Sequence, residues 1–173
     1  APVRGQALLK KAWFEESTEG LIALSGVHLG EVGAALLAHQ SARAHEQATW
    51  WKAQFPNRFY LELQRAGHPQ AEALISHSLD LANALGLPVV ATHPTQYLKP
   101  DEFTAHEARV CIATGFTLGN HRRPQEFTRD QFFLTQSEMA ARFADIPEAI
   151  ENSVELAKRC NVELTLGKNY LPE

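Results

Sequence analysis

Two segments of the sequence place polar side chains where a parallel sheet would hold a reaction site. The first carries Glu62 and Arg65 near the end of an apolar run, and the second ends in His93. Ligands and catalytic groups of parallel α/β sheets gather at the carboxyl ends of the strands. We therefore expect Glu62, Arg65 and His93 to face one cleft, together with His28, which follows an earlier apolar run.

The histidine content suggests a metal site, since the chain has eight histidines in 173 residues. Metal ligands must converge in space, and helical i, i+4 or strand i, i+2 spacing is the usual way to achieve this. Glu102 and His106 have helical spacing, but an isolated pair of this kind is more often a solvated pair. His77 lies on an apolar helical stripe and is expected to be a hydrogen-bonded core residue. The sequence has no His-x-His, His-Glu-x-x-His or Asp-x-His motif, so spacing alone supports no complete metal site.

Phosphate-binding patterns are equally sparse. Gly26 and Gly30 follow a predicted strand, but their spacing matches neither the P-loop nor the dinucleotide fingerprint. The basic pair Arg122 and Arg123 is the candidate phosphate contact. The alternative for this pair is an ordinary solvated loop.

Composition narrows the function classes. A hydrophobic content of 45% suits one compact domain or part of a larger one. The net charge of −4 gives no general basic field, so any nucleic-acid surface must be local. No apolar run reaches the roughly 20 residues that cross a bilayer, and the start lacks a signal-peptide core. Cys111 and Cys160 lack metal-type spacing and are expected to be buried thiols, and the ends are expected to be those of an excised piece.

The polar strand ends are positioned by an alternation of strands and helices. Predicted strands cover 21–24, 58–63 and 87–91, and predicted helices cover 30–40, 42–55 and 69–85. This order predicts βαβ units and a parallel sheet. Ser41 is the expected N-cap of the second helix, Pro69 suits the first position of the third, and Gly86 is its expected C-cap.

The second half of the chain has a different pattern. The predicted elements are, in order, a helix over 100–114, an irregular segment over 115–130, a helix capped by Ser137 that ends at Phe143, a helix over 145–160 and a closing strand over 162–166. The long last helix is predicted from Pro147 in its first turn and the acidic residue that follows.

Several segments resemble the PHP (polymerase and histidinol phosphatase) domain of bacterial DNA polymerase III alpha subunits. The matching segments are 20–26, 59–65, 86–92, 105–110 and, most specifically, 143–167, which reads FADIPEAIENSVELAKRCNVELTLG. They follow the order of the family from about residue 18 to the end of the chain. The chain is therefore similar to this family over nearly its whole length.

The resemblance implies an α/β fold: about the last three strands of a distorted (β/α)7 PHP barrel, followed by connector helices. It divides the chain into an entry or linker segment (1–17), the C-terminal part of the barrel (18–100) and a helical connector toward the polymerase palm (101–173). The palm carboxylates that bind catalytic Mg²⁺ would lie downstream. We therefore expect no catalytic residue, bound metal or cofactor in this chain, and Mg²⁺ in the parent polymerase.

The resemblance also implies that a metal site has been lost. Metal-binding members of the family carry a histidine after the second of these strands and an Asp-x-His after the third, and the matching residues here are Ala66, Pro94 and Gln96. The side chains of alanine and proline cannot ligate a metal, and glutamine is a poor substitute for imidazole. Rescue by a neighbouring histidine, His28, His68 or His93, is disfavoured because a shift of one residue along a strand reverses the direction of the side chain.

The interpretation favoured by this resemblance is a structural and docking part of a replicative polymerase in the bacterial cytoplasm, without membrane contact. The implied partners are the rest of the alpha subunit and the proofreading exonuclease subunit, with DNA and the sliding clamp bound through the full chain. One alternative is a metal-dependent phosphoesterase or 3′–5′ exonuclease of the PHP class. Another is a free-standing α/β barrel that processes sugars or amino acids, which the polymerase-type C-terminal segment disfavours.

Overall fold

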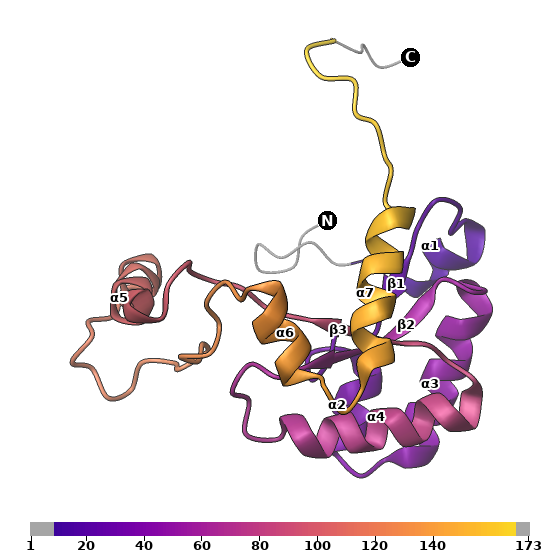
Figure 1. Ribbon diagram of the computed structural model, residues 1–173, viewed down its shortest axis with the longest axis horizontal. Coiled ribbons are helices and arrows are strands. Elements are labelled where there is room, and N and C mark those ends of the chain that lie inside the picture. The colour runs from indigo at the N-terminus through magenta and orange to yellow at the C-terminus, as the bar shows by residue number, and fades with distance from the viewer. Residues whose placement is uncertain (1–8, 169–173) are drawn as a thin grey trace.

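The computed structural model describes residues 9–168, in which strands and helices alternate before a largely helical second half (Figure 1). The elements are, in chain order, α1 (Lys11–Glu16), β1 (Ala23–Leu24), α2 (Glu31–Leu37), α3 (Ser41–Gln54), β2 (Phe59–Gln64), α4 (Ala71–Leu85), β3 (Val89–Thr92), the 3-10 helix η1 (Pro100–Glu102), α5 (Phe103–Thr114), α6 (Gln136–Arg142) and α7 (Pro147–Arg159). Among these residues, no helix combines the length and apolar character needed to cross a bilayer.

The strands form one parallel sheet in the order β1-β2-β3. Ala23 pairs with Phe59, and Leu61 pairs with Val89. Parallel neighbours connected by helices are the arrangement that the sequence predicts, so the α/β class is confirmed. Closure into a barrel stays a prediction, because the described residues contain three strands.

The side chains of β2 alternate between two environments. Phe59, Leu61 and Leu63 are at most 2% exposed and belong to the main hydrophobic core, which α2, α3, α4 and α7 complete. The opposite face of the strand carries Glu62 and Gln64, which are only partly buried. One strand therefore both anchors the sheet to its helices and presents polar groups near its carboxyl end.

Helix α7 packs against β3 (Figure 1). Asn152 donates a hydrogen bond of 2.8 Å to the carbonyl oxygen of Val89. At the end of the helix, Arg159 donates to the carbonyl oxygen of Asn57 and to the hydroxyl of Tyr60, just before and within β2. The helix therefore returns the chain to the amino ends of the strands. We call the sheet with α1–α4 and α7 the body.

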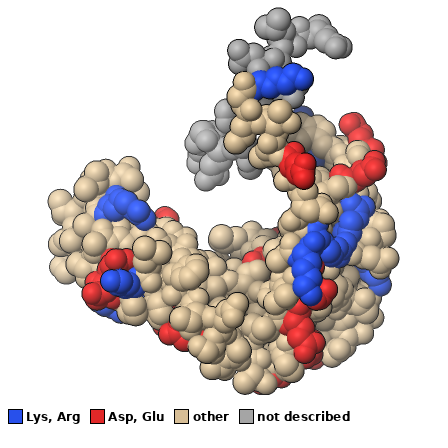
Figure 2. Space-filling model, turned by 45° about the horizontal axis from the view of Figure 1, so that its top comes forward, with Lys and Arg blue, Asp and Glu red and all other residues tan. Residues whose placement is uncertain are grey.

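Residues 93–135 project from the body and are called the arm (Figure 1). Ring contacts join Tyr97, Phe103, His106 and Phe127 inside it. A parallel bridge pairs Tyr97 with Phe132 at its base. The space-filling view shows the molecule hollowed between the arm and the side of α7, and acidic and basic side chains are mixed on that face (Figure 2).

Three predicted helix starts are wrong by one or two residues. Ser41 is the first residue of α3 rather than its N-cap, and Pro69 lies in the turn before α4. Ser137 lies inside α6, whose N-cap is Thr135 with extended backbone angles of φ −72° and ψ 163°. The hydroxyl of Thr135 accepts from the backbone N–H three residues later. A cap requires this extended backbone, which residue type alone does not specify.

Two further predictions are wrong. Residues 162–166 form no strand, because no described strand lies beside them to accept the pairing. Cys111 is buried as expected, but Cys160 is exposed at the end of α7. The other predicted strands and helices are present, and Gly86 ends α4 with φ 59°, the left-handed conformation expected of a glycine C-cap. Residues 1–8 of the predicted entry segment lie outside the described residues.

Candidate functional site

The carboxyl ends of the three strands meet in a group of polar side chains, which we call the strand-end cluster (Ser25, Glu62, Gln64 and Thr92). The carboxylate of Glu62 accepts hydrogen bonds from the hydroxyl of Thr92 at 2.5 Å and from the side-chain amide of Gln64 at 3.2 Å. It also accepts from the backbone N–H of Gly26 at 3.2 Å. Ser25 completes the group by accepting from the backbone N–H of Glu62 at 2.9 Å.

The strand-end cluster is suited to joining strands rather than to transferring protons. Glu62 is its single ionisable residue, and three donors already occupy its carboxylate oxygens. Gln64 also donates to the hydroxyl of Thr92 at 2.9 Å, so the contacts cross from β2 to β3 as well as to the end of β1. Hydrogen bonds to a charged acceptor are among the stronger ones in proteins. The cluster therefore fastens the carboxyl edge of the sheet.

A small cavity lies beside the strand-end cluster. Its volume is about 60 Å³, and its walls include His28, Gln64, Ala66, His68 and Pro94. This space corresponds to about two water molecules, far less than a nucleotide needs. The structure thus brings together two of the three positions that were predicted to have lost a metal ligand, Ala66 and Pro94. The third, Gln96, lines a different hollow on the arm.

The residues around this cavity do not fit a metal cluster. The carbonyl oxygen of Ala66 accepts a hydrogen bond from the hydroxyl of Thr128, and that of Pro94 accepts from the amide of Gln131 at 3.3 Å. The backbone N–H of Gln96 donates to the carbonyl oxygen of Gln131 at 2.8 Å. The bond between Thr128 and Ala66 joins the arm to the end of β2. The bonds of Pro94 and Gln96 to Gln131 instead join the two ends of the arm. No three His, Cys, Asp or Glu side chains within residues 9–168 are arranged to hold a metal ion.

The neighbouring histidines are engaged with one another or with backbone. The rings of His28 and His68 stack with centroids 4.3 Å apart. Burial, and secondarily the neighbouring His68, lowers the pKa of His28. His93 Nε2 lies 2.8 Å from the carbonyl oxygen of Phe132, and burial lowers the pKa of His93. His28 lines the cavity as expected, whereas His93, directly after β3, joins the two ends of the arm.

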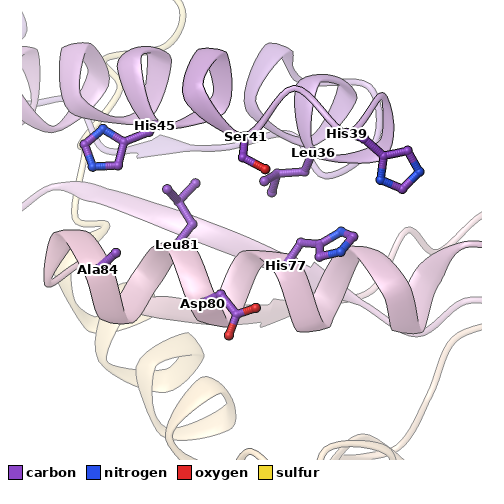
Figure 3. A pocket seen from close by; sticks show the side chains of 8 residues that line it. All are labelled: Leu36, His39, Ser41, His45, His77, Asp80, Leu81 and Ala84. Atoms are coloured by element: carbon purple, nitrogen blue, oxygen red, sulfur yellow. The ribbon is translucent and has the colours of Figure 1, made fainter.

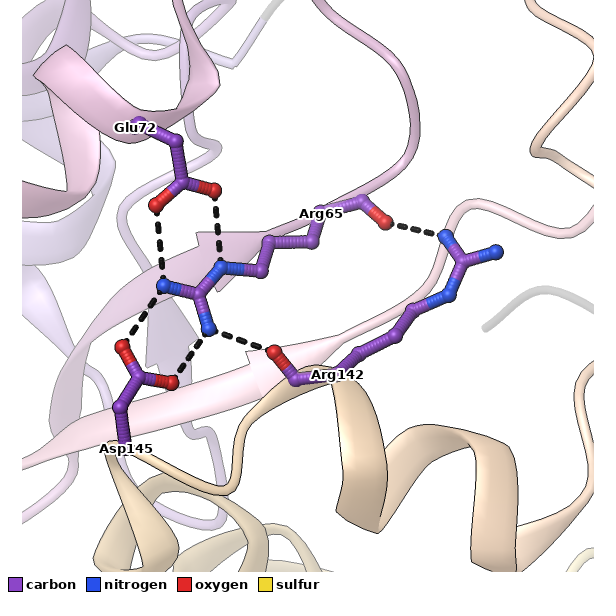
Figure 4. A network of polar contacts seen from close by, with 4 residues as sticks. All are labelled: Arg65, Glu72, Arg142 and Asp145. Atoms are coloured by element: carbon purple, nitrogen blue, oxygen red, sulfur yellow. Dashed lines mark hydrogen bonds and ion pairs between the residues drawn. The ribbon is translucent and has the colours of Figure 1, made fainter.

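Arg65 lies outside the cavity and forms a clamp between separate elements (Figure 4). Its guanidinium donates to Glu72 of α4 at 2.8 and 2.9 Å and to Asp145 before α7 at 2.6 and 2.9 Å. It also donates to the carbonyl oxygen of Arg142, whose own guanidinium donates to the carbonyl oxygen of Arg65 at 2.6 Å. We call Arg65, Glu72, Arg142 and Asp145 the Arg65 clamp.

The Arg65 clamp changes the titration of its members. Hydrogen bonds to Asp145 and Glu72 raise the pKa of Arg65, and the bond from Arg65 lowers the pKa of Asp145. Both carboxylates are exposed, at 70% for the Glu72 side chain and 61% for that of Asp145. Arg65 was predicted from its position at a strand end, but Asp145 lies 80 residues away and no local pattern connects the two.

The two arginines predicted to contact phosphate occupy different environments. Arg123 forms an ion pair with Glu107 inside the arm, where their side chains are 17% and 5% exposed. Arg122 is exposed, and its backbone N–H donates to the side chain of Asn120 at 2.9 Å. Phosphate contact by either residue stays a prediction. Arg122 is the more accessible of the two.

A second cleft, which the sequence did not predict, lies on the helical side of the sheet between α4 and the corner joining α2 to α3 (Figure 3). Leu36 and Leu81 contribute buried walls, and His39, His45 and His77 also line it. His77 was expected in the core with a hydrogen bond. It is instead half-buried, and its Nδ1 atom is buried without a hydrogen-bond partner among the described residues.

Comparison with known proteins finds sequences similar to this chain. The PHP domain family matches residues 3–66. The chain is 55% identical over 168 residues to DNA polymerase III subunit alpha of Neisseria meningitidis serogroup B, and 44% identical over 166 residues to that of Escherichia coli strain K12. Each match covers 96% of this chain.

The relatives are much longer than this chain. It spans 15% of the Neisseria protein and 14% of the Escherichia coli protein. The alpha subunit of Pseudomonas aeruginosa is 43% identical over 169 residues, with 98% of this chain and 14% of that protein covered. The resemblance to the PHP region of these subunits is thus confirmed. The division at residues 17 and 100 stays a prediction.

Proposed function

We propose that the chain is part of the alpha subunit of a bacterial DNA polymerase III, where it serves as a structural and docking unit with a degenerate metal site. The main support for the proposal is that positions predicted to have lost metal ligands take part in hydrogen bonds that shape the arm. Ala66 and Pro94 offer no ligating side chain, and their carbonyl oxygens bind Thr128 and Gln131 of the arm. At a place that serves metal ions in metal-binding PHP proteins, the hydrogen bond from Thr128 to Ala66 attaches the arm to β2, and the bond from Gln131 to Pro94 closes the base of the arm.

The polar network supports the structural role. The strand-end cluster connects the ends of all three strands, and the Arg65 clamp connects β2 to α4 and α7. Glu62 is the single carboxylate of the strand-end cluster, and the two carboxylates of the clamp, Glu72 and Asp145, are both bound by Arg65. The metal-dependent phosphoesterase or exonuclease therefore remains an alternative without a supporting observation in the described residues.

The remaining parts of the proposal concern the whole polymerase. The complete subunit would polymerise DNA with Mg²⁺ held by residues outside this chain, in the bacterial cytoplasm. Its partners would be the proofreading exonuclease subunit, DNA and the sliding clamp. The PHP region would contact the rest of the alpha subunit and help to dock the exonuclease.

The structural role is tested in the full-length protein with Glu62→Gln. We expect no stoichiometric Zn²⁺ or Mn²⁺ by elemental analysis, no phosphoesterase activity, and a lower melting temperature in the variant because Glu62 loses its charged hydrogen bonds. Glu163→Gln, an exposed glutamate outside the cluster, is the control and should leave the melting temperature unchanged. A bound stoichiometric metal together with a phosphoesterase activity that Glu62→Gln abolishes would overturn the structural role.

Docking is tested by capture of the purified proofreading subunit. Ile112 and Phe133 of the arm are 84% and 64% exposed, and Leu29 of the body is 87% exposed. Each is changed singly to Ser in the full-length protein, with polymerase activity on primed DNA as the check of folding. A docking role for this region predicts weaker capture for at least one variant. Unchanged capture by all three would contradict docking through these surfaces.

A further inference from the structure

The segment 161–167, which follows α7, leaves the body without pairing to a described strand. Residues 161–167, here called the tail, leave the end of the helix and run away from the body (Figure 1). Val162, Leu164 and Leu166 are 78%, 76% and 85% exposed. Within residues 9–168, no backbone hydrogen bond outside helices and strands involves the tail. The three apolar side chains are therefore largely exposed, and the tail amides make no backbone bond to the rest of the described chain.

The tail has the pattern of a half-buried strand. Val162, Leu164 and Leu166 recur at every second position, with Glu163 and Thr165 between them. In an extended chain this spacing places the three apolar side chains on one face and the polar ones on the other. Gly167 follows with φ 75°, a left-handed backbone that ends an extended run. The segment thus has an apolar face, a polar face and a defined end.

An extended segment with an exposed apolar face and an unpaired backbone is unfavourable in water. A row of unpaired N–H and C=O groups beside large exposed apolar side chains readily adds to a strand edge. Within residues 9–168 the outer strands of the sheet are β1 and β3, and the tail pairs with neither. Arg159, at the end of α7, is bonded to Asn57 and Tyr60, and Asn152 of α7 occupies the carbonyl oxygen of Val89 in β3. These contacts fix α7 on the sheet while the tail runs away from the body (Figure 1), which favours a partner outside the described residues.

We propose that residues 162–166 form a β-strand that adds to the edge of a sheet in another part of the same polypeptide. The relatives are several times longer than this chain, which spans 14–15% of their length, so a longer subunit would supply further residues for the pairing. A partner on the same polypeptide is present at high effective concentration, which favours it over a second molecule. At about 3.3 Å per residue, the seven residues of the tail reach roughly 23 Å from α7. This inference goes beyond the proposed docking role and depends only on the chain being part of a longer subunit.

Hydrogen exchange in the full-length protein, followed by mass spectrometry, tests the strand. We expect the amides of residues 162–166 to exchange roughly 100-fold or more slowly than unstructured peptide. Leu164→Pro should abolish this protection, because proline removes a backbone donor and disfavours a paired strand. The peptides that cover α7 should keep their protection, which shows that the variant remains folded.

Matched substitutions separate the two faces of the tail. Leu164→Asp on the apolar face should lower the protection of residues 162–166 at least 10-fold, whereas Thr165→Ser on the polar face should leave it unchanged. Exchange of these amides at the rate of unstructured peptide in the unmodified protein would overturn the proposal. Protection that appears only as protein concentration rises would also overturn it, by showing that a second copy provides the partner. Neither result depends on metal content or on capture of the proofreading subunit.

Discussion

The body and the arm bury different kinds of side chain. In the body, Phe59, Leu61 and Leu63 are at most 2% exposed, and helices on the same side complete an apolar core. In the arm, His106 and Glu107 are 5% and 4% exposed, and Arg123 lies against Glu107. The arm therefore encloses an ion pair where the body encloses hydrocarbon.

This difference determines how each region should respond to change. Apolar packing is spread over many weak contacts, so its loss scales with the volume removed. A buried charge depends on its partner, and removing one member leaves the other desolvated and unpaired. The body should therefore be sensitive to the size of its side chains, and the arm to their charge. We expect the strand-end cluster and the Arg65 clamp to show a sensitivity between that of the body and that of the arm.

The largest expected effect tests apolar packing in the body. Phe59→Ala should lower the free energy of unfolding of the body by about 4 kcal/mol, because a buried ring is removed and a cavity remains. Hydrogen exchange in the full-length protein should show faster exchange in β2 and in the helices that pack on it. The exposed Phe133→Ala is the control and should leave those peptides unchanged. Loss confined to the arm would contradict the assignment of the core.

The second test concerns the ion pair of the arm. Arg123→Ala should destabilise the arm by about 3 kcal/mol, because Glu107 would remain buried without a partner. Faster exchange should be limited to residues 93–135, while β2 keeps its protection. The adjacent exposed Arg122→Ala provides a matched control with little expected effect. Equal behaviour of the two variants would show that the pair does not stabilise the arm.

The Arg65 clamp should give a smaller change at the junction of α4 and α7. Arg65→Ala removes the hydrogen bonds to Glu72, Asp145 and the carbonyl of Arg142, with an expected cost of about 2 kcal/mol, since both carboxylates are exposed. The melting temperature of the full-length protein and hydrogen exchange in α7 measure the effect. Arg65→Lys keeps the charge but not the forked geometry and should recover only part of the stability. Full recovery by lysine would show that charge alone is sufficient.

The smallest expected effect is the dependence of the same clamp on pH. Arg65 lowers the pKa of Asp145 below its ordinary value of 3.8. The stabilisation is therefore fully present above that value and is lost as pH falls through the lower pKa of the folded state. Because Asp145 is largely exposed, the loss should stay below about 1 kcal/mol. Exchange in the first turn of α7 between pH 5 and pH 3 measures it, and Asp145→Asn should show no corresponding change.

The control for this pH effect is Glu138, whose pKa is also lowered, chiefly by its hydrogen bonds with Thr135. Glu138→Gln removes this second titration near α6 and should leave the response of the first turn of α7 in place. A response that disappears with Glu138→Gln and persists with Asp145→Asn would assign it to the helix cap instead of the Arg65 clamp.

Local patterns in the sequence were sufficient for the order of the elements. Alternating apolar residues in 59–63, the glycine at position 86 and the proline at position 147 specify a strand, a helix end and a helix start through backbone preferences that act over a few residues. The strand-end residues Glu62 and Gln64 could be placed in the same way. The tail has an equally clear strand pattern, but a strand also requires a neighbour, so the pattern alone did not produce one.

The sequence by itself thus determined the α/β alternation, the apolar face of the sheet and the presence of side chains at positions 66 and 94 that cannot ligate a metal. Only the tertiary structure decided what the backbone at these positions contacts. Thr128 reaches the carbonyl of Ala66 across 62 positions, and Asp145 reaches Arg65 across 80. Such contacts depend on how the helices and the arm pack, because side chains far apart in the chain become neighbours only after the core has brought their backbones together.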